Sequence, residues 1–219
     1  MTPPQALEES GAGLSKLRQG SDTSSAFDTL AQMMADVQFA TLDYAAVWIH
    51  ASLDEAAGSG EGARGKGGLF NPPNSFPVVY GALDLTTAGG EFRRLAHQNP
   101  IGMERLLPRH VYRFRLTSRD VLDLRQPAVR TAIALPQDGL FGVTTKYKQL
   151  IGEVAFALGI EAIVAPSATG IGDVVAVFPD LNPASKTSRE YMGIWLTPID
   201  VPGARMRGGW KCPIPGEAL

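Results

Sequence analysis

Cysteine is almost absent from this sequence, which contains only Cys212 among 219 residues. One cysteine cannot form an internal disulfide, and the chain suits a reducing cytoplasm. The first residues, Met1 to Leu14, lack the basic and apolar regions of a signal peptide. No apolar run approaches the roughly 18 residues that a membrane span needs. The sequence therefore predicts a cytoplasmic protein without a membrane anchor.

An excess of positive charge is also missing. The formal net charge is −2 and the sequence pI is about 5.9, so direct nucleic-acid binding through a basic surface is not expected. Hydrophobic residues make up 44% and charged residues 19%, which indicates a chain that folds around a core. We expect a mobile N-terminal arm at 1–24, one domain at 25–200 and a Pro/Gly-rich tail at 201–219.

Metal-binding and serine-nucleophile patterns are absent as well. His50, His97 and His110 stand alone, and no spacing of His, Cys, Asp and Glu resembles a metal site, so no metal is expected. No Gly-x-Ser-x-Gly elbow is present. Ser167 follows a predicted strand, in Pro-Ser-Ala-Thr-Gly, and is interpreted as a turn residue.

Hydrophobic periodicity predicts helices and strands that interleave, with strands dominating the last part of the chain. Helices are expected at about 26–40, 86–97, 127–135 and 145–158, and strands at 44–50, 78–83, 110–118, 162–165, 174–178 and 191–197. This order favours an α+β fold, a compact mixed sheet with flanking helices, over a doubly wound sheet. The glycine- and proline-rich segment 53–76 is expected to be a loop.

That loop contains two patterns found in nucleotide sites. Gly60, Gly62 and Gly65 match a dinucleotide fingerprint by letters, and Gly65-Lys66 resembles the end of a phosphate loop until Gly67 replaces the required Ser or Thr. Both motifs operate between a strand and a helix. The flanking residues predict neither, so a standard phosphate loop, and with it an NTPase, is disfavoured.

Glu91 lies on the predicted 86–97 helix, on or beside the inward face formed by Ala88, Phe92, Leu95 and Ala96. A buried carboxylate is costly unless it is paired or used, so this position suggests a functional residue. A solvated glutamate at the helix edge is the alternative.

Two lysines, Lys146 and Lys148, lie in the first turn of the 145–158 helix. The helix dipole disfavours cations there, and a bound anion would reverse that cost. Exposed lysines that tolerate a small penalty are the alternative.

Taken together, several segments resemble the RES domain family. They are Ser59–Arg64, Gly67–Pro73, Phe76–Tyr80, Glu91, Val121–Leu124 and Ala165–Gly170. Their order and spacing are compatible with that family over about residues 44–180. The resemblance implies a fold similar to ADP-ribosyltransferases and a bacterial toxin that an Xre-like helix-turn-helix antitoxin neutralises. It also implies that NAD⁺ is consumed by phosphorolysis, hydrolysis or ADP-ribosyl transfer.

The resemblance assigns catalytic roles to two residues. Tyr80 matches the family tyrosine and would stack on the nicotinamide, and Glu91 matches the family glutamate and would orient the ribose or stabilise its positive charge. Three other family positions differ, because Leu69 and Trp48 stand where arginines are expected and Lys146 where a serine is expected.

Cations elsewhere would have to hold the diphosphate of NAD⁺. The candidate NAD⁺-binding residues are Arg64, Lys66, Lys146 and Trp48. The alternative is a catalytically degenerate RES domain that binds a nucleotide or an antitoxin. A homo-oligomer is compatible with either hypothesis.

Overall fold

The computed structural model describes residues 23–52, 58–136, 140, 143–183 and 189–202. The predicted arm lies outside the described residues except for Thr23 and Ser24, which belong to a helix. Of the predicted tail, only Val201 and Pro202 are described, and Cys212 is not.

Helices and strands alternate through the first two thirds of the chain. The helices are α2 (Thr23–Ala35), α3 (Glu61–Lys66), α4 (Leu85–Gln98), α5 (Met103–Leu106), α6 (Pro127–Ala132) and α7 (Thr145–Ala157). The strands are β1 (Ala40–Ala51), β2 (Val79–Ala82), β3 (Arg109–Asp123), β4 (Ala162–Pro166), β5 (Asp173–Val177) and β6 (Arg189–Trp195). The predicted α+β class, a mixed sheet with flanking helices, is confirmed.

The sheet closes on itself. Its strand order is β1-β2-β5-β4-β3-β6, and β1 also pairs with β3. Only the β3–β4 pairing is parallel among the described strands. Strands β1 to β5 all contribute to one buried cluster, which fills the inside of the closed sheet: Val47, Ile49, Val79, Phe114, Leu116, Val121, Ala162, Val164, Val175 and Val177. Alternate residues of these strands therefore point outward, toward the helices.

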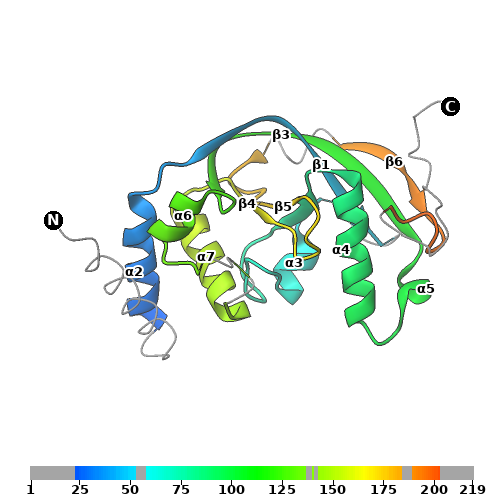
Figure 1. Cartoon of the computed structure of the whole chain (residues 1–219), viewed down its shortest axis with the longest axis horizontal. Coiled ribbons are helices and arrows are strands. Elements are labelled where there is room, and N and C mark those ends of the chain that lie inside the picture. The colour runs from blue at the N-terminus through cyan, green and yellow to red at the C-terminus, as the bar shows by residue number, and fades with distance from the viewer. Residues whose placement is uncertain (1–22, 53–57, 137–139, 141–142, 184–188, 203–219) are drawn as a thin grey trace.

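The helices cover the outer surface in two groups. Helices α2, α6 and α7 lie at one end of the sheet, and α4 and α5 lie at the other, with α3 between them (Figure 1). The two outward residues of β2 pack under different groups of helices. Tyr80 packs against the core under α7, whereas Ala82 belongs to the core under α4. Strand β2 thus lies beneath the junction of the two groups.

Local sequence explains how the two main helices start. The Asp84 side chain accepts a hydrogen bond from the Thr87 amide at the start of α4, and the Thr144 hydroxyl accepts one from the Tyr147 amide at the start of α7. Gly159, with φ of 78°, follows the end of α7 as predicted.

Three expectations about elements are wrong in detail. Residues 61–66 form helix α3 rather than loop; Gly60 and Gly67 bound it with positive φ, and the Asn71 side chain donates to the Ala63 carbonyl. The strand predicted at 110–118 continues to Asp123 as β3, because pairing with β1 extends past the polar residues Arg119 and Asp120 to Val121. Leu95 is 44% exposed although it was expected to face inward, since the inner face of α4 is filled by Ala88, Phe92 and Ala96.

Candidate active site

Glu91 is held on both carboxylate oxygens. Its Oε1 atom accepts hydrogen bonds from the Ser167 hydroxyl at 2.7 Å and the Ala168 amide at 3.1 Å. Its Oε2 atom accepts one from Arg94 Nε at 2.8 Å. The side chain is 19% exposed, so it reaches solvent or a ligand while its orientation is fixed. Glu91 is therefore an oriented carboxylate and not a solvated residue at a helix edge.

The turn between β4 and β5 is what meets Glu91. The Thr87 hydroxyl donates to the Ile171 carbonyl at 3.1 Å, and Gly90 faces the Thr169 side chain. These contacts dock the first half of α4 on the turn, so Ser167 lies opposite Glu91. Ser167 is in a turn, as predicted, since its carbonyl accepts from the Gly170 amide, but its contact with Glu91 was missed.

Helix α4 is also fixed by the segment that follows β6. Arg93 Nη2 donates to the carbonyls of Pro198 at 2.9 Å and Val201 at 2.6 Å. A Cβ atom at Gly89 would lie 2.3 Å from the Pro202 carbonyl oxygen, so this close approach requires glycine. The helix that presents Glu91 is thus held from two sides.

Tyr80 is the centre of a second hydrogen-bond group. Its hydroxyl donates to Asn71 Oδ1 at 2.8 Å and accepts from the Phe70 amide at 2.7 Å. Burial raises the pKa of Tyr80 well above its ordinary value, so the phenol stays neutral. A Cβ atom at Gly68 would lie 2.5 Å from the Tyr80 ring, so glycine lets the loop pass over it. The contacts leave the predicted stacking role of Tyr80 as a prediction.

Helix α7 fixes the same loop from the other side. Gln149 Nε2 donates to the Gly68 carbonyl at 3.1 Å and the Asn71 carbonyl at 3.2 Å. A Cβ atom at Gly152 would lie 1.6 Å from the Phe70 carbonyl oxygen. The loop at 67–71 is therefore clasped between Tyr80 of β2 and helix α7.

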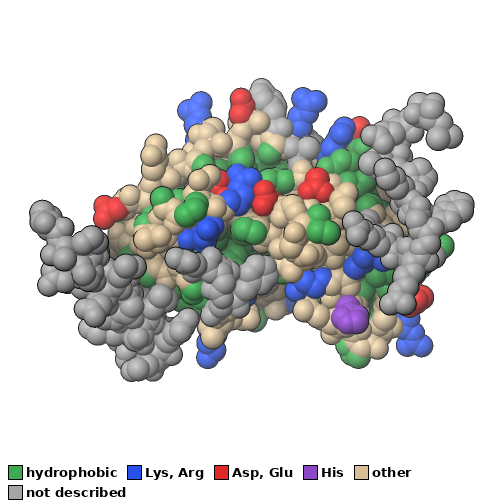
Figure 2. All heavy atoms as spheres, viewed as in Figure 1, with side chains coloured by type: hydrophobic (Ala, Val, Ile, Leu, Met, Phe, Trp, Pro, Cys, Tyr) green, Lys and Arg blue, Asp and Glu red, His purple; other side chains and the backbone are tan. Residues whose placement is uncertain are grey.

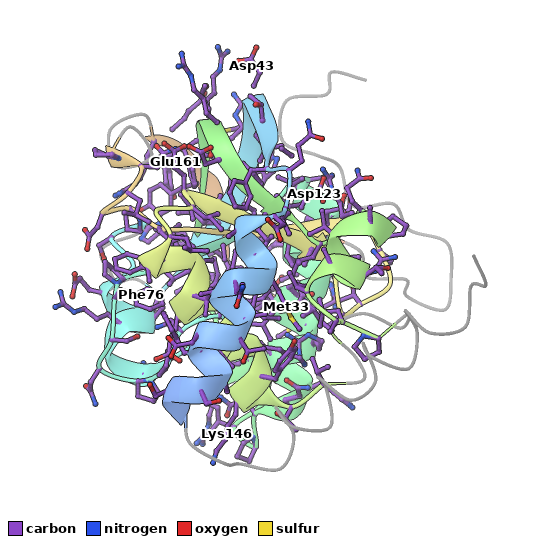
Figure 3. All side chains as sticks on the ribbon, turned by 90° about the vertical axis from the view of Figure 1, so that its left-hand side faces the viewer. Met33, Asp43, Phe76, Asp123, Lys146 and Glu161 are labelled. Carbon is purple, nitrogen blue, oxygen red and sulfur yellow. The ribbon has the colours of Figure 1, made fainter. Side chains whose placement is uncertain are left out.

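The predicted NAD⁺-binding residues lie apart from one another. Arg64 and Lys66 are exposed on α3, and Arg64 lies 3.6 Å from Glu61. Lys146 is exposed at the end of α7 that points away from the sheet, whereas Asp123 and Glu161 lie beside the sheet (Figure 3). Among the described residues, no hydrogen bond or ion pair joins these three cations to Glu91 or Tyr80. Their role stays a prediction.

Trp48 occupies the outer face of β1, directly opposite Ala82 of β2. It is half-buried against the core under α4, and the Arg113 guanidinium carbon lies 5.6 Å from its ring centroid. Its outward face is the one that also carries Ala82 and Tyr80. Binding of NAD⁺ by Trp48 stays a prediction.

Arg94, which sequence reasoning did not select, lies beside Glu91, whereas Lys148 was noted only for its place in the first turn of its helix. Arg94 bonds Glu91 directly. Lys148 is half-buried on α7, and its pKa is lowered by burial and by the positive charge of Arg94.

A depression of about 670 Å³ lies along the second half of α4. Its lining combines α4 with the segment that leads to α5: Arg93, Arg94, Ala96, His97, Asn99, Pro100, Gly102 and Met103. Arg94 borders both this depression and Glu91, but Tyr80 and Ser167 do not line it. Glu91 and Tyr80, the two predicted catalytic residues, therefore lie in the two hydrogen-bond groups described above and do not line this depression.

His50 packs against Phe92 on the inner face of α4. Its ring lies 5.1 Å from that of Phe92 and 5.7 Å from that of Trp195, and its Nδ1 atom accepts from Arg109. Burial, with a smaller contribution from Arg109, lowers the pKa of His50 to about 3. The histidine is therefore neutral at ordinary pH.

Other kinds of site find no support in the described part of the chain. It contains no group of three or more His, Cys, Asp or Glu side chains placed to hold a metal ion. None of its helices is long and apolar enough to cross a membrane. On the face seen in Figure 2, Lys and Arg side chains are interspersed with Asp and Glu side chains.

Comparison with known proteins points to one family. Residues 42–200 match the model of the RES domain. The NAD(+) phosphorylases MbcT of Mycobacterium tuberculosis and Mycobacterium bovis are each 34% identical over 122 residues, which span 55% of this chain and 66% of theirs.

A solved structure agrees with this match. The crystal structure of the M. tuberculosis MbcT–MbcA toxin–antitoxin complex contains a chain with a TM-score of 0.64 and 28% identity. The similarity covers 77% of this chain and 92% of that one. Because the family model spans residues 42–200, with both hydrogen-bond groups inside it, the chain belongs to the RES domain family.

Proposed function

We propose that this protein cleaves NAD⁺ at the bond between nicotinamide and ribose, with inorganic phosphate as the acceptor. The carrying observation is the Glu91 carboxylate, fixed on both oxygens beside the β4–β5 turn in a RES domain. Two relatives named NAD(+) phosphorylase, 34% identical over the matched region, support this choice of reaction.

The chemistry requires a negative group near the ribose. As the glycosidic bond breaks, positive charge develops on the ribose ring, and nicotinamide leaves with the bonding electron pair. A fixed carboxylate stabilises that charge without reorganising, which is the effective form of electrostatic catalysis. Glu91 supplies it, and the Ser167 hydroxyl and Ala168 amide keep its Oε1 atom in place.

Besides Ser167, which keeps Glu91 in place, Tyr80 has a supporting role in this proposal. Tyr80 holds the loop at 67–71 through Asn71 and Phe70. Stacking of its ring on nicotinamide is the role that the family resemblance implies. A phosphate oxygen then bonds to the ribose carbon that nicotinamide leaves, which gives ADP-ribose phosphorylated at that carbon. Water in place of phosphate would give free ADP-ribose.

The test is loss of NAD⁺ with purified protein, with and without inorganic phosphate, and identification of the products by mass spectrometry. We expect a phosphorylated ADP-ribose that needs phosphate, and a loss of activity of about 100-fold or more in Glu91→Gln. Turnover no higher than that of Glu91→Gln at every phosphate concentration would overturn the proposal.

A second candidate function is a binding module without activity. Leu69, Trp48 and Lys146 stand where the family resemblance expects two arginines and a serine, which motivates this alternative. Calorimetry would then show NAD⁺ binding, and the same sample would consume none. Any turnover that depends on Glu91 sinks this alternative.

We also propose that a small antitoxin of the Xre-like helix-turn-helix type binds this chain in the bacterial cytoplasm. The similarity to a chain of a toxin–antitoxin complex supports the existence of a partner. Co-expression with the product of the adjacent gene should give a complex in size-exclusion chromatography and suppress NAD⁺ loss. An adjacent gene product that neither binds nor inhibits would count against this proposal.

A further inference from the structure

The turn between β4 and β5 binds Glu91, but apolar packing does little to hold the turn itself. Most of its residues are exposed: Ala168, Gly170, Ile171 and Gly172. The last pair of the two strands before the turn joins Pro166 to Asp173, and proline has no amide hydrogen to donate to the ladder. The position of the turn therefore depends on polar contacts at its base.

An ion-pair group of Asp123, Arg125 and Asp173 lies at that base. Arg125 Nη1 donates to Asp173 Oδ2 at 3.0 Å. The same guanidinium binds Asp123 through two further hydrogen bonds, from Nε to Oδ1 and from Nη2 to Oδ2, each at 2.8 Å. One arginine thus joins the end of β3 to the start of β5 through two carboxylates.

The β3 half of the ion-pair group is held from several sides. The Asp123 side chain is 5% exposed and also accepts from the Arg125 amide at 3.0 Å. Burial alone would raise the pKa of Asp123, but the hydrogen bonds and charge of Arg125 hold it below its ordinary value, so this carboxylate is ionised at neutral pH. Arg130 of α6 donates to the Leu124 and Arg125 carbonyls at 2.8 and 2.7 Å. Asp173 therefore binds to a guanidinium that is itself fixed.

Asp173 is connected to Glu91 along two routes. It directly follows the turn in which the Ser167 hydroxyl binds Glu91. Its carbonyl accepts from the Leu83 amide at 3.0 Å, and Leu83 precedes Asp84, whose side chain caps α4. The turn that binds the carboxylate and the start of the helix that carries it are thus attached to one residue.

We propose that Asp173 is a positioning residue for Glu91, and that Arg125 and Asp123 hold it in place. A catalytic carboxylate that is misplaced relative to the ribose lowers the rate even when every reacting group is present, because orientation supplies much of the catalysis. The ion-pair group sets where the turn meets Glu91. Its effect on catalysis rests on the proposed function, whereas its hold on the turn does not.

The decisive variant is Asp173→Ala, which removes the link to the turn and leaves Asp123 paired with Arg125. Asp173→Asn keeps an acceptor for Arg125 and should recover most of the effect. Asp120→Ala is the matched control, because Asp120 is an exposed strand residue that forms no ion pair within the described part of the chain. Its carbonyl accepts from the Glu161 amide beside the start of β4, away from the turn.

Steady-state kinetics with NAD⁺ give the first measurement. Asp173→Ala should lower kcat about 10-fold and change the KM for NAD⁺ little, because the carboxylate is misplaced while the binding contacts remain. Asp120→Ala should match the wild type. In a Ser167→Ala background, Asp173→Ala should cost only about 2-fold more, since its effect passes through the same contact. A full 10-fold further loss there would show independent effects and overturn the assignment.

Hydrogen exchange separates this assignment from the proposed function. In the wild type the Ala168 amide donates to Glu91 and the Gly170 amide donates to the Ser167 carbonyl. Both amides should exchange about 10-fold faster in Asp173→Ala and at the wild-type rate in Asp120→Ala. Faster exchange in a protein that consumes no NAD⁺ would leave the hold on the turn standing and remove the proposed function. Unchanged exchange together with unchanged kcat in a folded Asp173→Ala protein would overturn the assignment.

Discussion

The two helices that border the candidate site differ in how far their polar groups are satisfied. On the α4 side, both oxygens of Glu91 have partners, and Arg93 binds three carbonyls of the segment at 198–202. On the α7 side, Gln149 Nε2 donates to two carbonyls of the loop at 67–71, and among the described residues no ion pair involves Lys146 or Lys148. The α4 side is therefore fixed through its charged side chains, whereas the α7 side is fixed through Gln149 and leaves its two first-turn lysines without an ion pair.

The largest expected effect tests the anchoring of the α7 side. Gly152→Ala should destabilise the protein by about 3 kcal/mol, because the new Cβ atom would overlap the Phe70 carbonyl, at 1.6 Å. Chemical denaturation measures this change. Gly65→Ala is the control, since no atom lies within 4 Å of that Cβ position, and it should leave stability equal or higher. Equal stabilities of the two variants would show that the loop does not depend on α7.

The next effect tests the anchoring of the α4 side through His50. The folded protein keeps His50 neutral to a pKa of about 3, while an unfolded histidine takes up a proton below about 6.5. Below pH 6.5 the unfolded state therefore binds more protons than the folded state. The stability that neutral His50 contributes is complete above pH 6.5 and is lost as the pH falls toward 3. The slope is at most about 1.4 kcal/mol per pH unit.

Denaturation at pH 7, 6, 5 and 4 checks this slope. His50→Asn keeps an acceptor for Arg109 but does not titrate, so its stability should fall less between pH 7 and 4. His97→Gln, at an exposed position, is the control and should follow the wild type. A wild type and a His50→Asn protein with parallel pH profiles would contradict the role given to burial.

A smaller effect concerns the orientation of Glu91. Ser167→Ala removes one donor to Oε1 and leaves the Ala168 amide in place, so the rate of NAD⁺ loss should fall about 10-fold. Thr169→Val is the matched control, because Thr169 contacts Ser167 but not Glu91. If Thr169→Val costs as much as Ser167→Ala, the turn as a whole and not the Ser167–Glu91 bond sets the rate.

The smallest effect sharpens the contrast between the two sides. Without a ligand, Lys148→Met should raise the free energy of unfolding by a few tenths of a kcal/mol, since it relieves repulsion with Arg94. Thermal melts test this statement. A variant less stable than the wild type in phosphate-free buffer would speak against like-charge repulsion.

Sequence reasoning reached the fold class and the main helix starts because these depend on local chemistry. Asp84 and Thr144 cap their helices, and the apolar periodicity marks each strand. It missed α3, since glycines that read as a loop bound a helix held by Asn71. The loop clasp by Gln149 had no signal in the sequence, because it joins segments about 80 residues apart.

Sequence reasoning predicted the central residues of the candidate site but not the contacts that hold them. Glu91 and Tyr80 were selected from the family resemblance, and each is the centre of a hydrogen-bond group. Ser167 lay in a segment that carried the resemblance, but its turn-like neighbours hid its contact with Glu91. The contact between Ser167 and Glu91 joins residues 76 apart in the sequence, which no local pattern encodes.

Closure of the sheet by β1 and β3 links assembly of the site to the order of synthesis. The pairing joins residues 40–51 to residues 109–123, and Ser167 comes later still. Such distant contacts make folding slow, because a long stretch of chain must be ordered before they form. A nascent chain whose β4 has not yet left the ribosome would contain Glu91 without its partners Ser167 and Ala168. We therefore expect chains truncated before Ala162 to lack the NAD⁺-cleaving activity proposed above.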